Sequence, residues 1–292
     1  MRSAVTLLIT LSVIATMTAL MGVMFKYLDT TRAKAEVKAS MIQANLLNAD
    51  IAQFLRQILG KKPSKGTMQT LFETPLALSA ESGEFSMGVS CQPLANRVNI
   101  SWLGLEESKK QKEFSLANSI FEMLADRVNL RDAQMLREKI IIALAESHSA
   151  TFGVAGRINK KKGIISFKIF QQILDDYRYE ADDKRIYRIP WQKYFSFGIS
   201  EQKIDGDFVS PELLAFLYDV DLSVVRENYE WGALNAFLSD IGESRNTYKW
   251  LFSDKALAIA RCRASYSFRK GSYGFVFNYM DRRVDSFEFF SN

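Results

Sequence analysis

Histidine and cysteine are almost absent from this 292-residue chain, which has one histidine and two cysteines. A structural zinc site is therefore not indicated, because such sites use four ligands that are mostly cysteine and histidine. The single histidine, His148, has no G-x-S-x-G motif to accompany it, so the sequence does not predict a serine hydrolase. A phosphate-binding loop ending in Lys-Ser/Thr is also missing. We expect a non-enzymatic protein.

Charged residues are absent from Ala4 to Phe25, an uncharged run of 22 residues. As a helix rising ~1.5 Å per residue, this run would extend about 33 Å and cross a hydrocarbon core of about 30 Å. Glycine and proline are both absent between Gly22 and Gly60, so nothing ends the helix after the run. We predict one long helix over residues 1–60 and a retained anchor, because a cleaved signal peptide has a shorter apolar region of ~7–15 residues.

The second half of this predicted helix is amphipathic. Its apolar residues recur at helical spacing and form a stripe along one side. We expect this stripe to bind partner proteins through Ile42, Leu46, Ile51, Leu55 and Ile58.

The charges on either side of the run bear on its orientation. Arg2 precedes it, whereas four basic residues follow it closely, which are Lys26, Arg32, Lys34 and Lys38. A positive-inside count would keep the large C-terminal body in the cytoplasm. We expect the opposite, a single-pass protein of the bacterial inner membrane with its body in the periplasm, for the reasons that follow.

The body has regions of different character. A β-rich piece comes first, helical periodicity follows, and the C-terminus is aromatic and alternating. The sequence predicts an α+β protein with a long N-terminal helix, a small antiparallel sheet and a large helical insertion. The expected division is residues 1–60 for the N-terminal helix, 61–110 for the first part of the β-rich domain, 111–250 for the helical insertion and 251–292 for the strands that complete the β-rich domain.

Several local signals place individual elements. Tyr273, Phe275, Phe277 and Tyr279 alternate strictly, and turn residues at 269–272 and 281–283 flank them, which predicts a three-stranded antiparallel meander. A turn at 159–163 is expected between strands 154–159 and 163–170. Ser210 followed by Pro211 predicts the start of a helix.

The two cysteines, Cys91 and Cys262, both lie in β-like stretches. In an oxidising periplasm they could form one disulfide between an early and a late strand. Two buried free thiols explain the same positions equally well. The sequence leaves both alternatives open.

Carboxylates gather at a few turns of the body. Asp205, Asp207 and Glu212 have the i, i+2 spacing of hard oxygen ligands and could hold a calcium ion. The segment does not match the twelve-residue EF-hand loop, and solvated turn carboxylates are the plainer explanation. A tethered carboxylate hydrolase is a further alternative, and it would require Asp205 and Asp219 to converge in one cleft. No other cofactor is indicated.

The net charge of +5 is small and spread along the chain. A nucleic-acid-binding protein concentrates its basic residues on one surface. We therefore expect no direct binding of nucleic acid.

Taken in order, these features resemble a known family. A nearly terminal apolar helix that continues as an amphipathic one is similar to the type IV pilins and the pseudopilins of type II secretion. Within that class the chain resembles the large minor pseudopilin, the K subunit, which lacks the glutamate found at the fifth mature position of its relatives. Cleavage after Ala4 would make Val5 the first residue and Ile9 the fifth. Residues 96–103, NRVNISWL, resemble the segment before the family's helical insertion, and residues 210–214, SPELL, resemble one of its helix starts.

The resemblance implies a subunit that initiates or caps the tip of a periplasmic pseudopilus. The missing acid normally pairs with a neighbour's terminal amine, and charges in lipid must be paired, so a subunit without it suits a position with nothing above it. Thr6, Ile9, Thr10 and Gly22 would pack in the bilayer or the fibre. Expected partners are other minor pseudopilins, or membrane components of a secretion or DNA-uptake machine, together with the lipid bilayer. The alternative is a membrane-anchored scaffold of another envelope complex.

Overall fold

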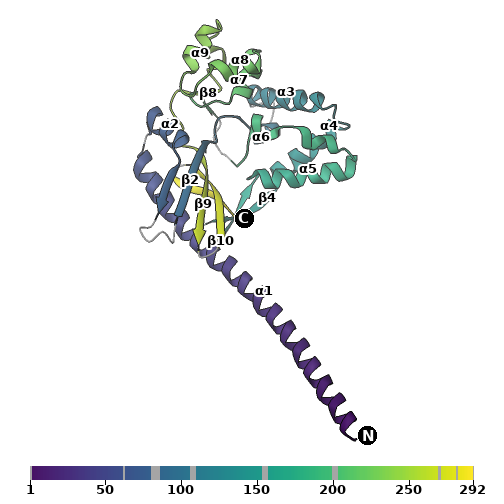
Figure 1. The fold of residues 1–292 in the computed structure, drawn as a ribbon. Helices are drawn as coiled ribbons and strands as arrows, with labels where there is room; N and C mark the ends of the chain where they lie inside the picture. The colour runs from purple at the N-terminus through teal and green to yellow at the C-terminus, as the bar shows by residue number, and fades with distance from the viewer. Residues whose placement is uncertain are drawn as a thin grey trace.

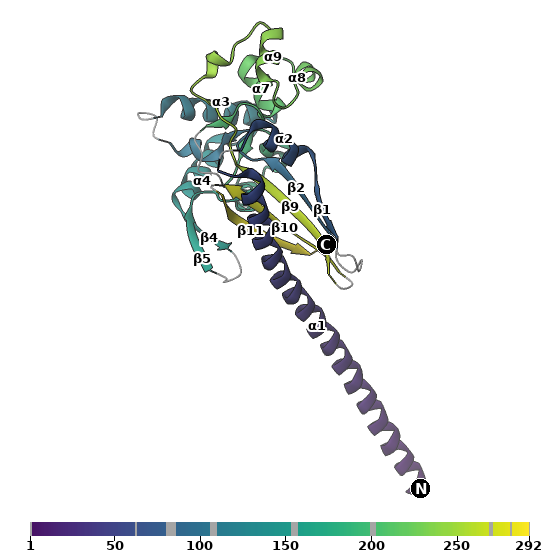
Figure 2. The same cartoon turned by 90° about the vertical axis from the view of Figure 1, so that its left-hand side faces the viewer.

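A single rod-shaped helix projects from an α+β body, and the N-terminus lies at the end of the rod farthest from the body (Figures 1 and 2). This computed structural model describes residues 2–61, 63–79, 86–105, 110–152, 157–198, 203–268, 271–280 and 282–291. Within these ranges the side chains of residues 2–10, 78–79, 147–162, 268, 285 and 291 are outside the description. The α+β fold class predicted from the sequence is confirmed.

The rod is helix α1, which runs unbroken from Arg2 to Leu59 over 58 residues. It ends where the sequence supplies its first glycine after Gly22. Gly60 has a φ of +59°, a left-handed conformation that a residue without a Cβ adopts at no steric cost. The chain then turns into α2 (Lys65–Glu73), where the Ser64 hydroxyl accepts a hydrogen bond from the backbone N–H of Thr67.

Five antiparallel strands form the main sheet, in the order β1–β2–β9–β10–β11. Its strands are β1 (Leu76–Ser79), β2 (Ser86–Pro93), β9 (Ala260–Phe268), β10 (Gly271–Met280) and β11 (Arg283–Ser291). The last three are the predicted C-terminal meander. The sheet joins strands from both ends of the body because β2 pairs with β9.

One face of this sheet packs on the C-terminal half of α1. The alternating aromatic residues point to this face, and Phe275, Phe277 and Tyr279 have no exposed surface. They share one apolar core with Leu47, Ile51 and Leu55 of α1, among others. Burying each large apolar side chain contributes about 1.5–3 kcal/mol, so this contact fixes the rod to the body.

A disulfide lies within this core. Cys91 on β2 and Cys262 on β9 face each other directly in the strand register, and their Sγ atoms are 2.00 Å apart. Both side chains are buried, at 3% and 0% exposure. Of the two alternatives left by the sequence, the structure therefore has the bonded one.

A second apolar core organises the helical domain between β2 and β9. Its elements are β3 (Val98–Asn99), η1 (Ile100–Gly104), α3 (Gln111–Arg127), α4 (Ala133–Ala145), β4 (Ser147–Phe152), β5 (Arg157–Lys162), α5 (Phe167–Ala181), η2 (Lys184–Arg188), α6 (Trp191–Tyr194), β6 (Phe195–Ser196), β7 (Ile204–Asp205), α7 (Pro211–Tyr218), α8 (Leu222–Asn228), α9 (Leu234–Asp240), η3 (Arg245–Tyr248) and β8 (Phe252–Ser253). Three two-stranded pairs occur here, β3–β6, β4–β5 and β7–β8.

The helical core begins earlier in the sequence than residue 111, where the insertion was expected to start. Val98, Trp102 and Leu103 are almost completely buried and belong to this core rather than to the sheet core. The short strand β3 explains the difference, because it pairs with β6 inside the helical domain. At the other end, Phe252 is the last residue of the cluster, close to the expected boundary at 250/251.

The hairpin predicted around residues 159–163 is shifted in the structure. β4 pairs with β5 across residues outside the described part of the chain, and segment 163–170 is not a strand. Helix α5 starts within it, because the Ser166 hydroxyl caps the backbone N–H of Ile169. Phe170, Ile173 and Tyr177 then follow at helical spacing and are buried. The β-branched residues of this segment favoured the wrong prediction.

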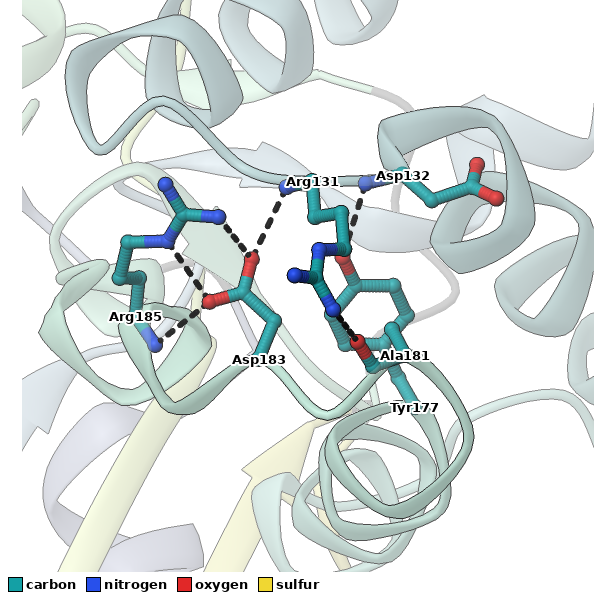
Figure 3. Close-up of polar contacts among 6 residues, drawn as sticks. All are labelled: Arg131, Asp132, Tyr177, Ala181, Asp183 and Arg185. Atoms are coloured by element: carbon teal, nitrogen blue, oxygen red, sulfur yellow. Dashed lines mark hydrogen bonds and ion pairs between the residues drawn. The ribbon is translucent and has the colours of Figure 1, made fainter.

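A buried carboxylate ties the end of α5 to the turn before α4 (Figure 3). Asp183 is 3% exposed and accepts hydrogen bonds from the guanidinium of Arg185, at 2.8 and 2.9 Å, and from the backbone N–H of Arg131. The Arg131 side chain donates in turn to the carbonyl of Ala181. Hydrogen bonds from Arg185 hold the pKa of Asp183 well below its ordinary value. This network fixes the helices of the second domain relative to one another.

Candidate membrane anchor and assembly surface

The N-terminal half of α1 exposes a continuous apolar surface. From Leu11 to Leu28, its large apolar side chains are between 47% and 70% exposed. A soluble monomer rarely exposes so large an apolar patch, which marks a surface for lipid or for other proteins. The best 18-residue window has a mean hydropathy of 1.6, and none of it is buried. This helix is long and apolar enough to cross a membrane.

Two threonine hydroxyls within this half are paired by the helix backbone itself. The Thr16 hydroxyl donates to the carbonyl of Ser12, and the Thr18 hydroxyl donates to the carbonyl of Ile14 at 2.8 Å. Such local bonds pair these two hydroxyl donors within the helix, as a hydrocarbon environment requires. A Cβ added at Gly22 would meet nothing within 4 Å, so this glycine presents bare backbone to whatever packs beside it.

A charged collar follows the apolar half. Residues 26–38 are all exposed, and their charged members are Lys26, Asp29, Arg32, Lys34, Glu36 and Lys38. Contact with the body begins only at Ser40, whose side chain is buried. At ~1.5 Å per residue, Lys26 and Ser40 are about 20 Å apart along the helix. The body is thus held away from the end of the apolar half by a solvated stretch of helix.

The rod is fastened where it meets the sheet. The Tyr266 hydroxyl donates to the carbonyl of Ser40, and the Ser40 hydroxyl donates to the carbonyl of Glu36 at 2.8 Å. Burial raises the pKa of Tyr266 to about 12, so the phenol keeps its proton and its donor role at neutral pH. This contact joins residue 266 to residue 40 across most of the sequence.

Of the five residues predicted to bind partners, the structure buries two and exposes three. Ile51 and Leu55, at 4% and 0% exposure, pack in the protein's own sheet core and are not available to a partner. Ile42, Leu46 and Ile58 are 62%, 45% and 44% exposed. The prediction was wrong for Ile51 and Leu55 because the sheet covers the side of the helix that carries them, whereas Ile42 and Leu46 lie on the opposite side.

Further apolar residues of this half are exposed, and the predicted binding stripe did not include them. Val37, Met41 and Phe54 are each at least 40% exposed. Together with Ile42, Leu46 and Ile58 we call them the exposed apolar residues of α1, and they lie on more than one side of the helix. Their signal in the sequence was weak, because helical spacing alone does not tell which side a sheet will cover.

The processing positions lie at the start of the rod. Ala4 and Val5 belong to α1, but their side chains are outside the described residues, as are those of Thr6, Ile9 and Thr10. Cleavage and packing at these positions stay predictions.

The carboxylates proposed for calcium do not form one site. Glu212 forms salt bridges with Arg226 at 2.9 Å and with Lys193 at 3.7 Å, and Asp207 faces Lys65 at 3.6 Å. Among the residues that the structure describes, no three acidic, histidine or cysteine side chains gather closely enough to hold a metal ion. Asp205, Asp207 and Glu212 thus have other partners, because the turn directs their side chains to different elements.

The buried carboxylate of Asp205 accepts hydrogen bonds from two backbone N–H groups. It is 2% exposed, and its two carboxylate oxygens accept hydrogen bonds from the N–H groups of Asp207 and Leu257 at 3.0 and 2.6 Å. Burial raises the pKa of Asp205 to about 6, although these hydrogen bonds oppose the rise. Asp219 lies at the exposed C-terminal cap of α7. Because Asp205 is turned into the protein, the carboxylate pair of a hydrolase is not assembled.

The local environment of Glu212 is different. Burial raises its pKa, but the hydrogen bond from Arg226 and the charges of Arg226 and Lys193 outweigh this and lower the pKa below its ordinary value. Glu212 follows Pro211 in the first turn of α7, whose Ser210 cap accepts from the N–H of Leu213. The predicted helix start at Ser210 is thus present, and its acid serves to join α7 to neighbouring elements.

Comparison with known proteins identifies the fold. No protein-family model matches the sequence. No curated protein matches it either. Among solved structures, one chain of the GspK–GspI–GspJ complex of the type 2 secretion system from enterotoxigenic Escherichia coli is similar, with a TM-score of 0.56 and 10% sequence identity. The similarity covers 89% of this chain and 100% of that chain. At such low identity it shows the fold alone, which is pseudopilin-like.

Proposed function

We propose that this chain is a non-enzymatic minor pseudopilin of the K type, which initiates or caps the tip of a periplasmic pseudopilus in type II secretion or in a related DNA-uptake machine. The observation that carries the proposal is the division of α1. Its N-terminal half exposes apolar side chains from Leu11 to Leu28, and its C-terminal half is built into the body. A subunit that moves from a bilayer into a helical fibre needs this arrangement.

Three further features support the proposal. The similar solved chain comes from a type 2 secretion complex, and the similarity extends over its full length. The Cys91–Cys262 disulfide is typical of an exported domain in an oxidising compartment. The helical domain enlarges the end of the molecule opposite the rod, where a further subunit would otherwise stack (Figure 1).

Partner subunits would pack along the rod. The exposed apolar residues of α1 that follow the charged collar, such as Ile42, Leu46 and Phe54, offer side chains for this contact. In lipid or in a fibre, the bare backbone at Gly22 permits close approach of a second helix. The absence of any acid between Ala4 and Phe25 would leave no charge to pair with the terminal amine of a subunit above.

The experiment that tests this proposal is the intact mass of the protein purified from its native membrane. A pseudopilin loses its short leader, so the expected species begins at Val5 and carries one N-terminal methyl group. An Ala4→Trp variant should block the cleavage and supplies the control. A species that retains the segment before Val5 would contradict the proposal and would favour a stationary scaffold of another envelope complex.

A further inference from the structure

A cleft lies on the face of the main sheet that points away from α1, at the place where the sheet meets the helical domain. Its volume is about 290 Å³. Strands β2 and β9 supply one wall through outward-facing residues, and β6 and α6 supply the other. Three arginines reach it, Arg97 from the loop after β2 and Arg261 and Arg263 from β9. The side-chain amides of Gln92 and Gln192 also line it.

The carboxylates of Glu212 and Glu288 lie near these arginines, the first acting on Arg97 through its charge and the second lining a hollow together with Arg261. Among the described residues, the Nε of Arg97 is buried without a hydrogen-bond partner. Within the same part of the chain, no carboxylate forms a salt bridge with Arg97, Arg261 or Arg263. The guanidinium of Arg263 lies 4.5 Å from the ring centroid of Phe290, which supports the group without cancelling its charge.

Arg97 and Arg261 repel each other. Burial is the main cause that lowers the pKa of Arg97, the charge of Glu212 raises it, and the charge of Arg261 lowers it by a smaller amount. Guanidinium groups keep their proton in proteins, so the positive charges persist at neutral pH. An anion bound between them would relieve the repulsion and complete the hydrogen bonding of Arg97 Nε.

A second hollow of about 380 Å³ lies farther along the same two strands. Gly88 pairs with Ser265 at that hollow, and two residues further along the strands Ser90 pairs with Arg263 at the cleft. Two strand residues extend about 7 Å, so the hollows are neighbours on one face. On the exposed face of β2 and β9 the residues that line this second hollow are small, and we call them the small-residue track: Ser86, Gly88, Ser265 and Ser267.

We propose that this cleft binds an acidic segment of a partner protein, with an aspartate or glutamate side chain held by Arg97, Arg261 and Arg263 and the flanking residues lying along the small-residue track. Guanidinium forks match the geometry of carboxylates and can form paired hydrogen bonds with them. The volume fits one or two side chains rather than a folded domain. This inference rests on the cleft and does not depend on the proposed pseudopilus role.

The test uses the full chain in detergent micelles and two fluorescein-labelled peptides, GSEGEGSG and its glutamine-matched counterpart GSQGQGSG. Fluorescence anisotropy at low salt measures their binding. Hydrogen bonds to charged groups contribute about 1.5–3 kcal/mol, so the acidic peptide should bind at least about tenfold more tightly than the glutamine peptide. Equal binding of the two peptides would overturn the proposal.

Variants locate the binding on the protein. The double substitution Arg261→Gln/Arg263→Gln should remove the preference for the acidic peptide, and Ser90→Trp should do so by filling the cleft without changing its charge. Arg127→Gln, an exposed arginine at the end of α3, is the matched control and should leave binding unchanged. Binding that survives the double substitution, or that Arg127→Gln weakens equally, would contradict the assignment. Tighter binding of a short single-stranded oligonucleotide, lost in the same double variant, would overturn it in favour of a phosphate backbone.

Discussion

Residues 11–28 and 44–59 belong to one helix, and both segments are rich in large apolar side chains. In the second segment Leu47, Leu55 and Leu59 are at most 8% exposed, because the aromatic face of the sheet covers them. In the first segment no large apolar side chain is covered by the protein. The difference shows that one uninterrupted helix passes through two different surroundings. The apolar side chains of its second segment are buried by the protein's own sheet, whereas those of its first segment can be buried only by lipid or by another protein.

The largest expected effect comes from creating a cavity in the half of α1 that the sheet covers. Leu55→Ala removes a side chain with 0% exposure, and the cavity should lower the free energy of unfolding by about 2–5 kcal/mol. Leu46→Ala, on the opposite side of the same helix and 45% exposed, should change it by less than about 0.5 kcal/mol. Chemical denaturation of both full-length variants in micelles measures the contrast. Equal losses would mean that the assignment of helix sides is incorrect.

A charge placed in the uncovered half should weaken membrane insertion instead. Leu20→Arg puts a guanidinium near the middle of the apolar segment, at a cost of about 2.5–3.5 kcal/mol for a helix centre in a bilayer. The fraction of protein that resists alkaline carbonate extraction should fall. Leu46→Arg, beyond the charged collar, should leave it unchanged. If both variants stay membrane-bound to the same extent, lipid does not cover residues 11–28.

Two buried carboxylates of the helical domain, Asp205 and Asp183, differ in how they respond to pH, and Asp205 has its effect in the range nearer neutral pH. Its pKa rises from 3.8 to about 6 on folding, so the fold prefers the protonated carboxyl. Its contribution is therefore greatest at low pH and is lost as the pH rises from about 4 to about 7, a difference of about 3 kcal/mol. Unfolding free energies of the wild type and Asp205→Asn, measured over this range, should diverge by that amount. Parallel profiles would contradict the burial argument.

Asp183 should behave in the opposite way, with a smaller effect. Its folded-state pKa is lowered from 3.8 by Arg185, so its stabilisation is present above that pH and is lost as the pH falls below it. Asp183→Asn should cost about 1.5–3 kcal/mol at neutral pH, because a hydrogen-bonded charge pair is broken. The gap between variant and wild type should shrink in acid. If the difference in unfolding free energy between the variant and the wild type stays constant down to about pH 2, the negative charge of Asp183 does not stabilise the network.

The sequence predicted the features that depend on local pattern. The continuity of α1 follows from the absence of glycine and proline between Gly22 and Gly60, and the C-terminal meander follows from the alternation of aromatic residues. The helix start at Ser210 follows from its cap and Pro211. These signals need no knowledge of distant contacts.

Features that depend on tertiary contacts could not be predicted in the same way. Ile51 and Leu55 look like an open binding surface until strands from the other end of the chain cover them. The arginine cleft joins Arg97 to Arg261 and Arg263 through the pairing of β2 with β9, and no sequence window contains all three. The same pairing decides that the two cysteines meet.

The most direct test of the account is to map which part of α1 touches lipid. A lipid carrying a diazirine group, activated in native membranes, labels whatever lies in the hydrocarbon core. Trypsin cuts after Lys26 and Lys38, so the two halves of α1 fall into separate peptides for mass spectrometry. We predict label on the peptide that ends at Lys26 and none on the peptide that begins at Ala39. Label on the second peptide, or none on the first, would contradict the division of α1 into a lipid-covered half and a sheet-covered half.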